Sequence, residues 1–165
     1  MRMFSRIIGN GGIAAILAAL GTFAGVAPSF AQGETFRSVS VDTSPIAEAG
    51  RPAYASIVQR AVTPAISAAF ADRINPGDPR GLRLVIRIHS VTLPLVTGSS
   101  HWSDNDFMKS EGLVVDARGR IVSVTPLLSP AQSWTASPNL PVEAADFQRI
   151  QALGQQTAYW LKRKI

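Results

Sequence analysis

Residues 81–94, GLRLVIRIHSVTLP, form the longest clean alternation of apolar and polar side chains in the chain. One parity carries four aliphatic residues, Leu82, Leu84, Ile86 and Ile88. The other parity carries Arg83, Val85, Arg87 and His89. A period of two over this length predicts a β-strand that buries one face and turns the other outward. The rest of the chain must then supply the elements that cover the aliphatic face.

The first covering element is predicted between about residues 53 and 74, where apolar residues recur at the helical spacings of three and four. Pro64 falls inside this segment. It either kinks one helix or begins a second one, with Thr63 as the N-cap. We favour one kinked helix, ended by the turn-forming sequence NPGDPRG at 75–81.

The second covering helix is predicted from about residue 142 to 163. Glu143 near its start and the bases at 162–164 near its end match the helix dipole. Gly154 lies in the middle of its apolar face, where it costs about 1 kcal/mol relative to Ala. We therefore expect this helix to approach the sheet closely at Gly154, and Trp160 to pack at the edge of its apolar stripe.

Three further strands complete the sheet. Residues 36–42 alternate and predict a first strand, which runs into a turn and then a loop before the first helix. Residues 107–115 and 121–128 flank the turn sequence DARGR, in which Gly119 suits the left-handed position of a hairpin. Residues 129–141 contain three prolines and are expected to form an extended connection.

The element order predicts an α+β domain of the type βαβββα. We expect a four-stranded, mostly antiparallel sheet with two helices packed on one face, covering the aliphatic side of strand 82–93. The chain contains no Cys, so burial alone must hold the domain together, without disulfides.

The N-terminus has the pattern of a secretory signal. Arg2 and Arg6 precede an apolar run over 13–27, and the small residues Ser29 and Ala31 suit a signal peptidase. The run is shorter than the about 20 residues that a membrane span requires. We expect cleavage after Ala31 and no stable membrane anchor afterwards. The expected location is the periplasm of a Gram-negative cell, with secretion as the alternative.

Removal of residues 1–31 leaves a single domain over 32–165, with 14 basic against 11 acidic side chains. This mild excess of positive charge argues against a nucleic-acid partner.

In this layout, residues 35–165 resemble small exported α/β proteins of Gram-negative envelopes. Similar families are the lipopolysaccharide-assembly lipoprotein LptE, the auxiliary lipoproteins of ABC transporters and the N-terminal domain of TolB. The similar features are the early strand, the amphipathic helix, the alternating strand, the hairpin and the closing helix. The resemblance implies a non-enzymatic role in an envelope complex. The chain departs from the lipoproteins because it has no Cys for lipid attachment.

Two alternatives for the chemistry of the chain lie in one polar loop. His101, Asp104 and Asp106 are close enough in sequence to share a hard cation, and a small exported metal-dependent enzyme or hydrolase is the alternative function. The spacing does not match an EF-hand. Ser99 and Ser100 lie too near His101 in sequence for a serine triad to align. We therefore favour a turn stabilised by local hydrogen bonds, with no enzymatic activity and no cofactor.

The candidate binding residues lie elsewhere. Arg83, Arg87 and His89 share the outward face of the alternating strand and would form a basic strip for an anionic envelope component. Trp102 and Trp134 lie in loops, either as anchors of small apolar clusters or as exposed aromatics for a partner or glycan. The sequence thus predicts a periplasmic binding or accessory protein of the cell envelope.

Overall fold

The computed structural model describes residues 34–94, 105–132 and 141–165. The strands are β1 (Phe36–Asp42), β2 (Leu82–Thr92), β3 (Asn105–Val115) and β4 (Ile121–Gln132). The helices are α1 (Ser44–Glu48), α2 (Pro52–Ala69), a 3₁₀ turn (Ala71–Arg73) and α3 (Val142–Lys164). The predicted α+β class and element order are confirmed, with α1 added where the sequence predicted only a turn and loop.

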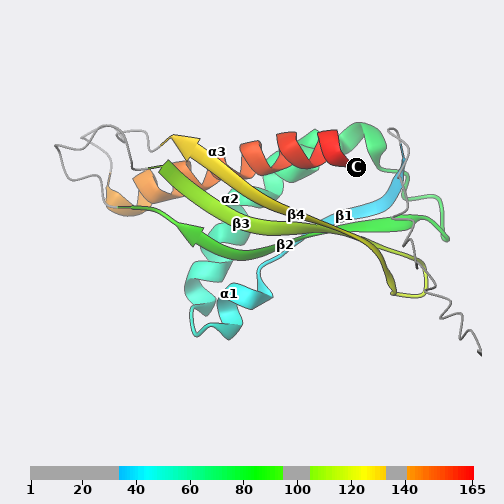
Figure 1. Cartoon of the computed structure of the whole chain (residues 1–165), viewed down its shortest axis with the longest axis horizontal. Coiled ribbons are helices and arrows are strands. Elements are labelled where there is room, and N and C mark those ends of the chain that lie inside the picture. The colour runs from blue at the N-terminus through cyan, green and yellow to red at the C-terminus, as the bar shows by residue number, and fades with distance from the viewer. Residues whose placement is uncertain (1–33, 95–104, 133–140) are drawn as a thin grey trace, which may run out of the picture.

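The sheet is mixed, with strand order β1-β2-β3-β4. β1 runs parallel to β2, whereas β3 pairs antiparallel with both β2 and β4. The strands curve, and the long helices α2 and α3 lie together along one side of them (Figure 1). The mostly antiparallel sheet with two helices on one face is therefore as predicted.

The core lies between this helix pair and the sheet. Leu84, Ile86 and Ile88 are fully buried, as their parity predicts, while Leu82 at the strand end is only half-buried. Each fully buried aliphatic side chain of this size contributes about 1.5–3 kcal/mol. Hydrophobic residues from both helices complete the cluster, among them Val58, Val62, Ile66, Ile150, Leu153 and Leu161.

A β-bulge interrupts β2 at His89. Ile88 pairs with Ser110 and Ser90 pairs with Lys109, so His89 is the extra residue on β2. The extra residue shifts the side-chain parity by one position, which returns Val91 to the core. The alternation read from sequence therefore holds only as far as His89.

Gly154 does not approach the sheet as predicted. A Cβ atom at Gly154 would lie 3.2 Å from Val62 Cα, so the close approach is to α2. The missing side chain allows the two long helices to cross in contact. The close approach of α3 to the sheet occurs instead at Gly112 of β3. Leu161 of α3 packs over this glycine.

Prolines are accommodated in two elements. Pro64 lies inside α2, which stays a single helix as favoured, and the Thr63 hydroxyl donates to the Gln59 carbonyl at 2.7 Å. β4 continues through Pro126 and Pro130 to Gln132, whereas the sequence predicted a strand end near 128. An edge strand tolerates proline because the missing N–H can lie on the unpaired side. In the described ranges, no helix has the length and apolar character needed to cross a membrane.

Candidate functional site

The sheet face opposite the helices carries the predicted basic strip. Pairing places Arg83 beside Ser38 of β1, and Arg87 between Asp42 of β1 and Glu111 of β3. Arg83 is exposed and Arg87 is half-buried. The three predicted residues Arg83, Arg87 and His89 thus follow β2 on one face.

Two carboxylates, those of Asp42 and Glu111, neutralise part of the positive charge of this strip. Arg87 Nε lies 2.9 Å from Asp42 Oδ2, and Glu111 Oε1 lies 3.7 Å from Arg87 Nη1 and 3.2 Å from His89 Nε2. Partial burial opposes ionisation of Asp42, but hydrogen bonds from Arg87 and Ser44 outweigh it and lower the pKa of this carboxyl. Of the predicted strip, Arg83 is the base that no carboxylate contacts among the described residues. Whether the strip binds an anion stays a prediction.

Asp106, a candidate metal ligand from the sequence, is fully buried at the start of β3. Its carboxylate accepts hydrogen bonds from Arg149 Nε at 3.0 Å and from Arg149 Nη2. The same Nη2 donates to the Pro94 carbonyl at 2.9 Å. The hydrogen bond to Asp106 raises the pKa of Arg149 above its ordinary value. Asp106 thus serves an ion pair that joins α3 to the ends of β2 and β3.

The other loop candidates His101, Asp104, Trp102 and Trp134 lie outside the described residues. Among the residues that are described, no group of three or more His, Asp or Glu side chains could hold a metal ion. The metal alternative therefore stays a prediction for that loop.

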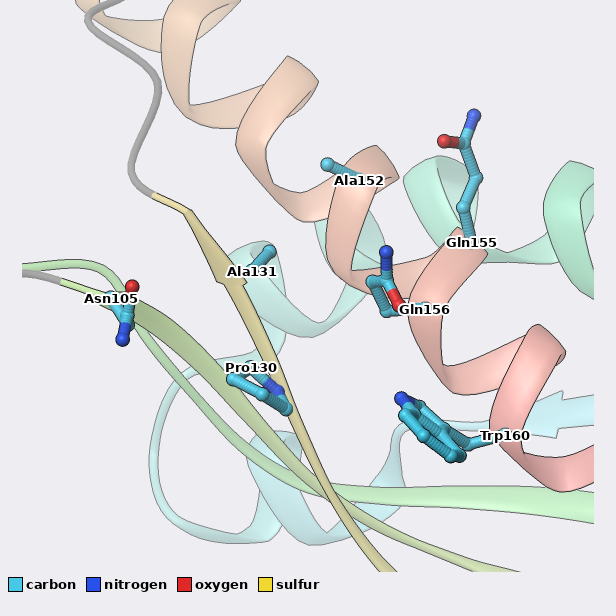
Figure 2. A pocket seen from close by; sticks show the side chains of 7 residues that line it. All are labelled: Asn105, Pro130, Ala131, Ala152, Gln155, Gln156 and Trp160. Atoms are coloured by element: carbon cyan, nitrogen blue, oxygen red, sulfur yellow. The ribbon is translucent and has the colours of Figure 1, made fainter.

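An open cleft lies between α3 and β4, with a volume of about 640 Å³ (Figure 2). Its lining combines three primary amides, one indole and three small apolar residues: Asn105, Gln155, Gln156, Trp160, Pro130, Ala131 and Ala152. None of these side chains titrates near neutral pH or is a nucleophile. The arrangement is suited to hydrogen bonding and stacking.

Helical spacing builds one wall of this cleft. Ala152, Gln156 and Trp160 recur every four residues, so they share one face of α3. Trp160 projects from α3 toward the space beside β4 (Figure 2), and 41% of its surface is exposed. Its partial exposure agrees with the predicted place at the edge of the apolar stripe. The spacing of Gln156 and Trp160 was visible in the sequence, but the opposing wall on β4 was not.

A buried hydrogen bond joins the two elements that form the walls of this cleft. The Thr157 hydroxyl on α3 donates to Ser129 Oγ on β4 at 2.9 Å, and both residues are fully buried. Each is the chain neighbour of a cleft residue, Gln156 and Pro130 respectively. A polar contact inside the core therefore connects α3 to β4 next to the cleft.

A second cleft, of about 560 Å³, lies on the other side of α3 against α2. Alanines of both helices line it together with Tyr159, Lys162, Arg163 and Gln155, which also lines the first cleft. Lys162 Nζ lies 2.8 Å from Asp72 Oδ1, and the Arg163 guanidinium donates to the Tyr159 hydroxyl at 2.6 Å. This cleft is charged, unlike the one between α3 and β4.

Comparisons with known proteins identify no family for the chain. No family model matches it, and no curated protein matches it. Among solved structures it is similar to a minor lipoprotein from Acinetobacter baumannii, with 14% identity and a TM-score of 0.42 over 78% of this chain and 94% of that chain. It is also similar to a PelC dodecamer subunit from Paraburkholderia phytofirmans, with 16% identity and a TM-score of 0.34 over 79% and 92% of the two chains. The resemblance to LptE, to the auxiliary lipoproteins of ABC transporters and to TolB stays a prediction.

Proposed function

We propose that this chain is a non-enzymatic binding protein of the cell envelope, exported to the periplasm, that holds its ligand in the cleft between α3 and β4. The observation that carries this proposal is the lining of that cleft. The seven described residues of the lining offer amides, an indole and small apolar surfaces, and none of the seven is an acid, base or nucleophile.

The lining supports binding rather than reaction. General acid–base and covalent catalysis require a titratable or nucleophilic group within hydrogen-bond reach of the reacting atoms. Binding sites instead combine apolar surface with a few polar groups that orient the ligand. The signal pattern of residues 1–31 supports export, which would bring the cleft into contact with envelope components.

The test of binding compares Ala152→Phe with Gln148→Phe by cosedimentation with purified envelope fragments. Ala152 lines the cleft, so the larger side chain should fill it and weaken binding by about tenfold or more. Gln148 is an exposed residue of the same helix outside the cleft, so the control variant should bind like the wild type. Equal binding by both variants would refute a role for the cleft.

The test of export is the N-terminus of the protein recovered from the periplasm. We expect it to begin at Gln32, directly after the predicted cleavage site. Recovery of uncleaved chain from the cytoplasm alone would contradict the proposed location.

A further inference from the structure

We infer that the ligand of the α3–β4 cleft is an uncharged polyhydroxylated molecule, specifically a short neutral oligosaccharide. This inference rests on the proposed binding function and adds the chemical class of the ligand. Three features of the lining carry it: an exposed indole, free amides and the lack of charge.

Trp160 offers a flat apolar surface for a sugar ring. Its indole is 41% exposed although it is among the largest apolar side chains of the domain. Tyr159 contacts it edge-on with ring centroids 5.3 Å apart, and the Arg163 guanidinium lies 5.9 Å from its centroid. The indole of Trp160 points from α3 toward the cleft that it lines (Figure 2). The C–H face of a pyranose can cover such a ring and remove apolar surface from water.

The amides match sugar hydroxyls in hydrogen-bonding capacity. Each primary amide carries two donors and an acceptor, and each hydroxyl both donates and accepts. Within the described part of the chain, the side chains of Asn105, Gln155 and Gln156 form no hydrogen bond, so they are available to a ligand. Gln156 and Trp160 lie one turn apart, about 6 Å along the helix axis. An extended ligand can therefore stack on the indole and hydrogen-bond to the amide at the same time.

The charge and size of the cleft further restrict the chemical class of the ligand. Among the described residues, no charged side chain lines it, whereas Lys162 and Arg163 line the cleft on the other side of α3. An ionised ligand would leave water without gaining a counter-charge, which is unfavourable. The volume of about 640 Å³ falls within the range of about 300–1,000 Å³ typical of sites for small organic ligands.

The experiment is isothermal titration calorimetry on the protein purified from the periplasmic fraction. The probes are three uncharged tetrasaccharides, maltotetraose, cellotetraose and chitotetraose, with tetragalacturonate as the acidic probe and tetraglucosamine as the cationic one. We expect at least one uncharged probe to bind and neither charged probe to bind more tightly. Preference for a charged probe, or no binding of any uncharged one, would overturn the inference.

Variants of the lining residues test whether the oligosaccharide binds in the α3–β4 cleft. Trp160→Ala should weaken it about tenfold, and Trp160→Phe should restore most of the affinity because a ring remains. Gln156→Leu keeps the side-chain volume and should weaken binding about threefold to tenfold through the lost hydrogen bonds. Gln148→Ala is the control, since Gln148 is an exposed residue of the same helix that lines neither cleft, and it should bind like the wild type. Equal affinity of Trp160→Ala and Gln148→Ala would also overturn the inference.

Failure of this inference can be distinguished from failure of the proposed function. If no uncharged tetrasaccharide binds but Ala152→Phe still releases the protein from envelope fragments, the ligand class is wrong and the binding role stands. If Ala152→Phe has no effect on cosedimentation, the binding role itself fails.

Discussion

Arg149 on α3 donates hydrogen bonds through two nitrogen atoms to the carboxylate of Asp106, a fully buried residue on β3. Only 11% of the Arg149 side chain is exposed. The pair joins the final helix to the sheet at the end from which the segment between β2 and β3 departs. Sequence alone favours a local turn at Asp106, with a metal ligand as the alternative, because its partner lies 43 residues away along the chain.

Asp106→Ala should destabilise the domain by about 3–5 kcal/mol, because it leaves the Arg149 charge buried without its partner. The measurement is the free energy of unfolding from urea titration. Asp146→Ala is the matched control, since Asp146 also contacts Arg149, at 3.2 Å, but is 41% exposed. An exposed pair contributes less than about 1 kcal/mol. Similar losses of unfolding free energy in both variants would therefore contradict a stabilising role for the buried Asp106–Arg149 ion pair.

Gly154→Ala should also destabilise the domain, by about 1 kcal/mol or more. Alanine favours the helix by about 1 kcal/mol, but its Cβ would lie 3.2 Å from Val62 Cα and 3.3 Å from both Val62 methyl groups. The backbone of α2 cannot yield as a side-chain end can, so overpacking outweighs propensity. The measurement is thermal unfolding of both variants and the wild type. Gln148→Ala, at an exposed position of α3, should be neutral or slightly stabilising in these melts. A stabilised Gly154→Ala variant would show that the helices separate readily.

Asp42 should make stability depend on pH in the acid range. Its pKa is lowered below 3.8 in the folded protein because hydrogen bonds from Arg87 and Ser44 outweigh the opposing effect of burial. A lowered pKa stabilises the fold above the unfolded value, and this contribution is lost as pH falls from about 3.8 through the folded pKa. The contribution of the Asp42 carboxylate to stability should be less than about 1 kcal/mol, because 37% of the side chain of its partner Arg87 is exposed. The measurement is the urea midpoint of unfolding as a function of pH for the wild type and Asp42→Asn. The two midpoints should differ above a pH of about 3.8 and converge below the folded pKa of Asp42. A difference that stays constant with pH would contradict the pairing of Asp42 with Arg87.

Anion binding by the outward face, if it occurs, should depend mainly on Arg83. Arg87 is already compensated by Asp42 and Glu111, whereas Arg83 is exposed. Arg83→Ala should weaken binding to lipopolysaccharide or acidic vesicles about fivefold, the effect of one base near an anionic surface. Arg83→Ala/Arg87→Ala should add little. The control is Arg60→Ala, an exposed base on α2. Unchanged affinity in the double variant would remove the basic-strip hypothesis.

Local periodicity predicted most of the elements of this fold. The alternation before His89 located β2 and its buried face, and the hairpin and both long helices followed from turn residues and helical spacing. The prediction failed where a neighbour decides the outcome. Pro130 stays in a strand because β4 is an edge, and Gly154 contacts Val62 because the helices cross there.

The sequence by itself determined the α+β class, the element order and the buried parity of the central strand, because these depend on spacings of two and of three to four residues. Only the tertiary structure decided the polar partners and the cleft. Asp106 pairs with Arg149, and Trp160 and Pro130 line the same cleft, although the members of each pair lie far apart in the chain. Such contacts depend on how the elements pack, and periodicity within one element carries no information about them.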